Sequence, residues 1–88
     1  KMISKKVTVI NKSGLHLRPA SIMSQIAQKC PSTVEFIKGD KVINPKSVLM
    51  LMAGGIMCGD EIEIRCEGAT EAEDLNTLVE AINSGLGE

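Results

Sequence analysis

Aromatic residues are almost absent from this 88-residue chain, and neither charge sign is in excess. Phe36 is the only aromatic residue, because tryptophan and tyrosine do not occur. Ten lysines and arginines oppose eleven aspartates and glutamates, so the formal net charge is −1. General nucleic-acid binders show a basic surplus, and single-strand binders stack bases on aromatic rings. The composition therefore argues against a direct nucleic-acid partner.

Long apolar runs are also missing, and the cysteines form no recognisable pattern. No run is long enough to span a bilayer, and no signal-peptide pattern is visible. Cys30, Cys58 and Cys66 are odd in number and include no C-x-x-C pair, which argues against a disulfide framework or a zinc site. We expect three reduced thiols, packed as small hydrophobic side chains, in a cytoplasmic protein without membrane insertion, metal or cofactor.

Alternating apolar residues predict four β-strands, over residues 3–10, 33–38, 41–44 and 61–66. Ile3, Val7 and Val9 form the apolar face of the first segment, although Lys5 interrupts it. Gly39-Asp40 joins the second segment to the third and suits a tight hairpin turn. In the fourth segment the apolar residues alternate with charged ones and are expected to face the core: Ile62, Ile64 and Cys66.

Three segments predict helices. The first runs from about residue 17 to residue 29 and ends before Pro31, which cannot continue a helical hydrogen-bond ladder. Its apolar stripe consists of Ala20, Met23, Ile26, Ala27 and Cys30. The second is the stretch VLMLM, which periodicity alone leaves open between strand and helix. Ser47 as its N-cap and Gly54-Gly55 as its stop favour one or two helical turns.

The third helix is predicted to begin with a capping box, in which Thr70 is the N-cap and Glu73 follows three residues later. Gly85 is its expected C-cap. Its predicted buried stripe consists of Ala72, Leu75, Leu78, Val79 and Ile82. The resulting order β-α-β-β-α-β-α predicts one α+β domain over residues 1–88. The helices should cover one face of a sheet that the hairpin makes at least partly antiparallel.

The stretch SGLHLRPAS contains the only histidine, His16, between a glycine-containing turn and the first predicted helix. A helix N-terminus presents unpaired N–H groups and a positive dipole end, which suit an anion. Arg18 adds a fork of donors that matches phosphate, and Pro19 suits a first helical turn. Because Pro19 also biases Arg18 away from the α conformation, the first helical residue stays open.

These groups suit phosphoryl transfer through His16. A neutral imidazole is a nucleophile, and phosphoryl transfer asks the protein mainly for positioning and charge stabilisation. No second base, metal cluster or nucleotide-binding loop is visible, so the residues indicate a carrier rather than an enzyme. The alternative is that His16 is only a polar cap of the helix.

GLHLRPAS resembles the phosphorylation-site motif of the HPr family, the histidine-containing phosphocarriers of the bacterial phosphoenolpyruvate:sugar phosphotransferase system. NPKSVLMLM, GDEIEI and SGLGE extend the resemblance over essentially the whole chain. It implies an open-faced β-sandwich, with a four-stranded antiparallel sheet and three helices on one face. It also implies that His16 carries the phosphoryl group on Nδ1, beside Arg18 and the backbone N–H of Leu17. The group would come from phosphorylated enzyme I and go to enzyme IIA domains for sugar uptake. Leu17 stands where alanine is usual.

The resemblance to HPr of the Gram-positive type gives Ser47 a second interpretation beside its N-cap role. It implies regulatory phosphorylation of Ser47 by HPr kinase/phosphorylase and binding of a catabolite-control transcription factor. The expected partner surface comprises Pro19, Ala20, Lys46, Val48, Leu49, Leu51 and Met52. About half of the apolar residues after Ser47 should face the core, and the rest should form an exposed patch beside His16. Met50 and Gly54 depart from residues common in the family.

Two related functions remain as alternatives. An HPr-like regulatory binding module would act only through Ser47, but such proteins lack the histidine, so His16, Arg18 and Pro19 argue against it. A nitrogen-branch phosphocarrier would keep the histidine and stays open.

Overall fold

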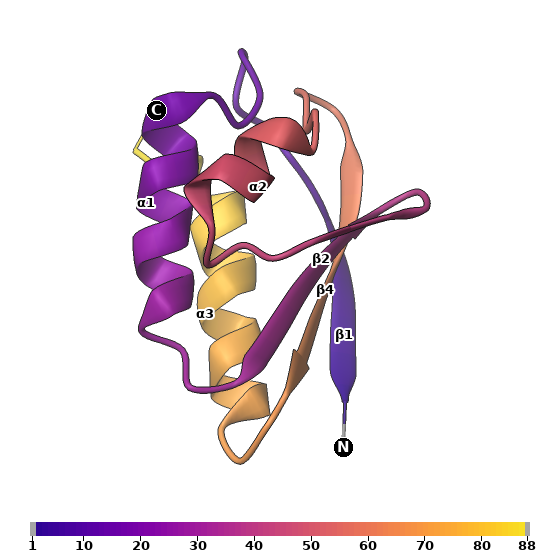
Figure 1. Ribbon diagram of the computed structural model, residues 1–88, viewed down its shortest axis with the longest axis vertical. Coiled ribbons are helices and arrows are strands. Elements are labelled where there is room, and N and C mark those ends of the chain that lie inside the picture. Colours follow the sequence, from indigo (N-terminus) through magenta and orange to yellow (C-terminus); the bar gives the residue numbers. More distant parts are fainter. Residues whose placement is uncertain (1, 88) are drawn as a thin grey trace.

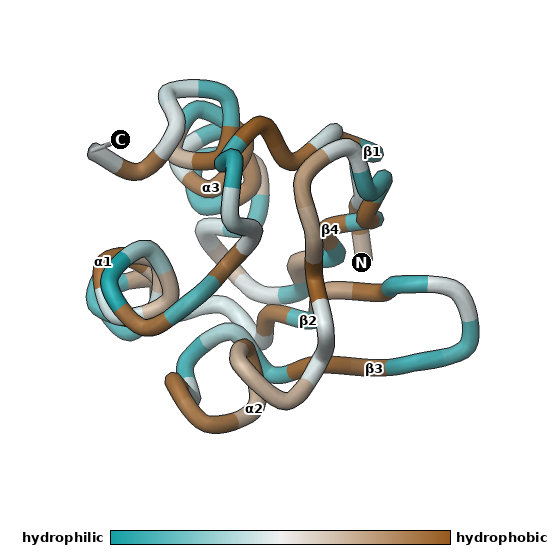
Figure 2. The backbone as a smooth tube through the Cα atoms, turned by 90° about the horizontal axis from the view of Figure 1, so that it is seen from above, coloured by the Kyte–Doolittle hydropathy of each residue, from teal (hydrophilic) through white to brown (hydrophobic). Residues whose placement is uncertain are grey.

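The computed structural model describes residues 2–87 and has the predicted element order. The strands are β1 (Ile3–Thr8), β2 (Thr33–Lys38), β3 (Lys41–Ile43) and β4 (Glu61–Glu67). The helices are α1 (Leu17–Gln28), α2 (Val48–Ala53) and α3 (Glu71–Asn83). All three helices lie on one side of the sheet, as Figures 1 and 2 show from two directions. The predicted domain also included residues 1 and 88, and the latter ends the motif SGLGE; both lie outside the described residues.

The sheet has the order β1-β4-β2-β3, and each neighbouring pair of strands is antiparallel. In the centre, Ile64 of β4 lies opposite Lys5 of β1 on one side and Phe36 of β2 on the other. Gly39, in the turn between β2 and β3, has a positive φ of 59°, as a tight hairpin requires. The predicted α+β class, with an antiparallel sheet covered on one face, is therefore confirmed.

The core lies between the sheet and the helices. Phe36 is fully buried, together with Met23 of α1, Leu51 of α2 and Leu78 of α3. Ile62, Ile64 and Cys66 are also buried, as their alternation predicts. Burying a large apolar side chain contributes about 1.5–3 kcal/mol, so the burial of Leu51 in the core stabilises even a helix as short as α2.

Some predicted boundaries are wrong by one or two residues. Strand β1 ends at Thr8 rather than residue 10. Val9 exchanges hydrogen bonds with Gly59 and Asp60, which lie in the loop before β4, instead of with β4 itself. Helix α1 ends at Gln28 rather than Lys29.

The predicted ends of α3 need correction. Thr70 is the N-cap, but its side chain makes no capping bond; its hydroxyl donates to Asp74 Oδ2 at 2.9 Å. There is accordingly no Thr70–Glu73 capping box. At the other end Ser84 is the C-cap, and Gly85 follows it with a φ of 82°.

The buried face of α3 also differs from the prediction, because Ala72 is exposed while the charged Asp74 is buried. Burial alone would raise the pKa of Asp74, but hydrogen bonds from the Ser32 hydroxyl, the Thr70 hydroxyl and the Ser32 N–H hold that pKa below its usual value. The carboxylate thereby joins the turn before β2 to the start of α3.

The cysteines are unpaired, and two of them pack as predicted. Burial raises the pKa of Cys66 to about 11, and burial together with the nearby Asp74 charge raises the pKa of Cys30. Both thiols are therefore protonated near neutral pH and behave as small hydrophobic groups. The prediction is wrong for Cys58, which is exposed in the loop between α2 and β4.

Candidate functional site

The loop between β1 and α1 brings His16 to the start of α1 and is held against the loop after α2. The N–H of Leu15 donates to the Ile56 carbonyl at 3.0 Å. The N–H of Gly14 donates to the backbone carbonyl of Asn11 at 2.9 Å. Gly14 has a φ of 69°, and a Cβ at this position would overlap the Ile56 carbonyl oxygen. Only glycine fits this turn without displacing the backbone beside it.

His16 is the N-cap residue of α1. Its backbone is extended, with φ −76° and ψ −170°, and its carbonyl accepts a hydrogen bond from the Ala20 N–H at 2.9 Å. The imidazole makes no capping hydrogen bond, and the residue is exposed. The alternative of a purely capping side chain is therefore wrong.

The first turn of α1 suits an anion. The helix begins at Leu17, so Arg18 is helical in spite of the proline that follows it. Leu17 and Arg18 contribute N–H groups that have no partner within a helix, whereas Pro19 has none to contribute. The first turn contains no acidic residue, and Arg18 is exposed. The positive end of the helix dipole and a permanent cation, Arg18, thus both lie within two residues of His16.

The second predicted site, Ser47, lies at the start of α2. Its hydroxyl accepts a hydrogen bond from the Met50 N–H at 3.2 Å, so the predicted N-cap role is confirmed. The ammonium group of the neighbouring Lys46 donates to the Ser32 carbonyl at 2.9 Å. The Lys46 carbonyl accepts from Ser24 of α1 at 2.9 Å. These bonds hold the start of α2 against the body of the domain.

Exposed apolar side chains occur on α1 and α2. These two helices pack against each other and lie side by side in Figure 2. Leu49 is 80% exposed, Leu17 61% and Met52 43%. These three residues are called the docking face, after the role proposed for them below. Val48 is half-buried, and Met50 is exposed as well.

Three other residues predicted for the partner surface lie in the interior. Pro19, Ala20 and Leu51 are buried, so their side chains form part of the packing rather than of a surface. The predicted division of the VLMLM stretch between core and solvent is nevertheless confirmed, because Leu51 faces the core while Leu49 and Met52 face solvent.

The described residues offer neither a metal-binding cluster nor a membrane-spanning helix. Within residues 2–87, no group of three or more histidine, cysteine, aspartate or glutamate side chains could hold a metal ion. In the same range, no helix has the length and apolar character that crossing a bilayer requires.

Comparison with known proteins gives consistent matches over the whole chain. Residues 3–84 match the family model described as the PTS HPr component phosphorylation site. The chain is 37% identical to the phosphocarrier protein HPr of Neisseria meningitidis serogroup A over 87 residues, which cover 99% of this chain and 98% of that protein. The crystal structure of an HPr from Thermoanaerobacter tengcongensis superposes with a TM-score of 0.92 at 35% identity, covering 98% of this chain and 97% of that one. An HPr structure from Bacillus anthracis gives a TM-score of 0.87 at 33% identity, covering 92% and 96%.

Proposed function

The chain belongs to the HPr family of phosphocarriers of the phosphotransferase system, and we propose that it carries the phosphoryl group on His16. In this proposal the donor is phosphorylated enzyme I and the acceptors are enzyme IIA domains. The observation that supports it most directly is the exposed imidazole at the N-cap of α1, which takes no part in capping the helix.

In the proposed step, Nδ1 of the neutral imidazole attacks the phosphorus of the donor. The bond between Nδ1 and phosphorus forms as the bond between phosphorus and the donor atom breaks. The donor atom keeps the electron pair of the broken bond. The reverse exchange delivers the group to the next protein, so no water, metal or nucleotide is consumed. Arg18 and the N–H of Leu17 face the charge that develops on the phosphoryl oxygens, which is the main demand of phosphoryl transfer.

The docking face would receive the partners in turn. Leu17, Leu49 and Met52 offer exposed apolar side chains, and the unbranched side chain of Met52 adapts to differently shaped surfaces. Because successive partners use one histidine, their contacts with this protein must overlap. We propose that the exchange takes place in the cytoplasm.

Ser47 is proposed as a second, regulatory phosphorylation site. Its hydroxyl is half-exposed at the start of α2, next to the docking face. HPr kinase/phosphorylase would be the modifying enzyme, and a catabolite-control transcription factor would bind the phosphorylated form. The added charge of about −1.5 to −2 would oppose partners that present carboxylates there.

The proposal is tested by incubating the protein with enzyme I and ³²P-labelled phosphoenolpyruvate. We expect one label per chain that is lost in acid and kept in base, as for a phosphohistidine. His16→Ala should take up no label while keeping its melting temperature, because the replaced side chain is exposed. Ser47→Ala is the control and should label normally. Retained label in His16→Ala, or an acid-stable adduct, would contradict the proposal.

A further inference from the structure

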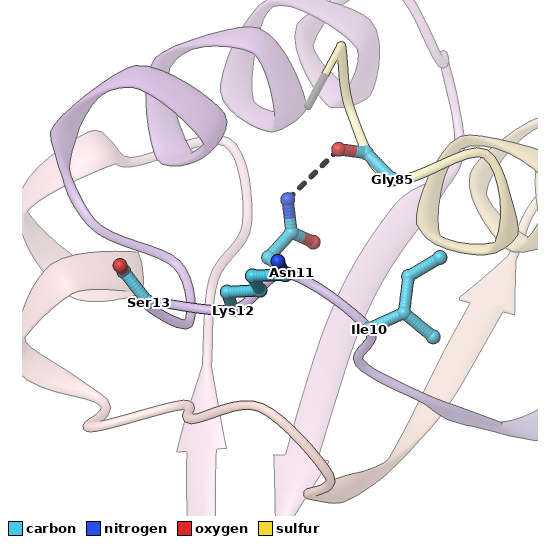
Figure 3. Close-up of a pocket in the computed structure, with 5 residues that line it drawn as sticks. All are labelled: Ile10, Asn11, Lys12, Ser13 and Gly85. Carbon is cyan, nitrogen blue, oxygen red and sulfur yellow. Dashed lines mark hydrogen bonds between the residues drawn. The ribbon is translucent and has the colours of Figure 1, made fainter.

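The loop that carries His16 has a second attachment, on the side away from α2. Asn11 is a polar residue at the start of this loop, yet it is only 2% exposed. Its Nδ2 group donates a hydrogen bond to the carbonyl oxygen of Gly85 at 2.8 Å. Figure 3 shows the amide pointing from the loop towards Gly85, whereas the side chain of Ser13 lies apart from it. The bond joins residues 74 positions apart in the chain.

The partner of this bond is itself firmly placed. Gly85 is buried and directly follows the C-cap of α3 with a φ of 82°. Leu86, the next residue, is 2% exposed and belongs to the hydrophobic core. The turn after α3 is therefore a fixed support rather than a loose end, and a bond to it restrains the loop.

Together the two attachments hold both halves of the loop. Asn11 connects the first half to α3, and Leu15 connects the second half to the Ile56 carbonyl. His16 follows Leu15 directly, so the orientation of its imidazole relative to the first turn of α1 depends on where this loop is held. The Asn11 bond thus ties the first half of the loop to the turn after α3, in addition to its covalent connection to β1.

From this arrangement we infer that Asn11 is a positioning residue for phosphoryl transfer. It holds the loop so that the imidazole, the N–H groups at the start of α1 and Arg18 meet the phosphoryl group together. The inference rests on the proposed role of His16. Asn11 does not contact the phosphoryl group; it acts through the loop, and small displacements of a reacting group have large effects on rate.

The test compares Asn11→Ala with a variant that loses a part-buried side-chain hydrogen bond elsewhere. Thr70→Val removes the hydroxyl bond to Asp74 at the opposite end of α3 and leaves the loop untouched. Transfer from phosphorylated enzyme I is measured over a range of carrier concentrations, at a temperature where melting curves show both variants folded. Asn11→Ala should lower kcat about 10-fold with little change in KM, since the docking face is intact. Thr70→Val should lower the melting temperature but keep the kcat of the unsubstituted protein.

If Asn11→Ala does not fold, the smaller change Asn11→Ser replaces it in the test. NMR spectra of that variant should show displaced ring resonances of the His16 imidazole. A normal kcat in a folded Asn11 variant would overturn the inference. An equal fall in kcat in Thr70→Val would also overturn the inference, because the fall would then follow from lost stability alone. If the unsubstituted protein takes up no label at His16, the proposed function fails instead, and the two failures are thus distinguishable.

Discussion

The starts of α1 and α2 are alike in backbone but differ in how they use the N-cap side chain. Both N-cap residues are extended, His16 with φ −76° and ψ −170° and Ser47 with φ −112° and ψ 117°. Ser47 closes its helix by accepting the Met50 N–H, whereas His16 makes no capping bond. A change at Ser47 is therefore expected to affect the helix itself, while a change at His16 removes no capping bond and, under the proposed function, affects phosphoryl transfer.

The neighbouring cations differ in the same way. Lys46, beside Ser47, is half-buried and its ammonium group donates to the Ser32 carbonyl. Arg18, beside His16, is exposed in the first turn of α1. The start of α2 is thus built into the domain, and the start of α1 presents its charge to solvent. This difference predicts separate effects on stability and on transfer.

The largest effect is expected from Arg18→Glu, which reverses the charge at the start of α1. We expect transfer from enzyme I to slow by about 100-fold, because a carboxylate replaces the donors that face the phosphoryl oxygens. The melting temperature should hardly change, since a negative charge is favourable at a helix N-terminus. Arg18→Lys is the control that keeps the charge but loses the fork, and its rate should fall between the two. A lowered melting temperature with normal transfer would show that Arg18 stabilises the fold instead of the transferring phosphoryl group.

Gly14→Ala should have the next largest effect, and it concerns only the α1 side of the comparison. The added Cβ meets the Ile56 carbonyl at a positive φ, so we expect a loss of about 3 kcal/mol in the free energy of unfolding. Urea denaturation measures the loss. Gly39→Ala is the matched control: its φ is also positive, but no atom lies within 4 Å, so about 1 kcal/mol should be lost. Equal losses in the two variants would show that the contact with Ile56 does not constrain the loop.

The smallest effects are expected at Ser47. Ser47→Ala removes the cap and should cost about 1 kcal/mol of stability while transfer stays normal. Ser47→Asp keeps a capping oxygen, so its thermal melt should match that of the unsubstituted protein, and the new charge beside the docking face should slow transfer a few-fold. If Ser47→Asp transfers normally and authentic phosphoserine does so too, Ser47 is a cap without a regulatory role.

Local patterns were sufficient for most of the fold. The alternation in residues 61–66 identified a strand with one buried face, and Gly39-Asp40 identified the hairpin. Periodicity alone leaves VLMLM open between strand and helix. Ser47 as an N-cap correctly predicts the helix, because capping chemistry is local and independent of the apolar pattern. The order of these elements then limited the architecture to helices on one face of a sheet.

Local patterns failed where burial depends on a distant partner. Asp74 is charged and is absent from the predicted buried stripe of α3, but hydrogen bonds from Ser32 and Thr70 make its burial tolerable. Cysteine is among the residues most often buried, yet Cys58 lies exposed in the loop between α2 and β4. Ala20 lies in the apolar stripe of α1, yet it was also assigned to the partner surface. Only the packed structure shows that Ala20 is completely buried in the core.

The sequence by itself determined the class of the fold, the place of His16 at a helix N-terminus and the capping role of Ser47. Each of these depends on residues within a few positions of one another, where spacing is translated directly into geometry. The tertiary structure alone decided that Leu17, Leu49 and Met52 remain exposed while Leu51 does not, and that Asn11 reaches Gly85. Such contacts join residues far apart in the chain, and a local period specifies which face a residue occupies but not which distant group comes to lie against it.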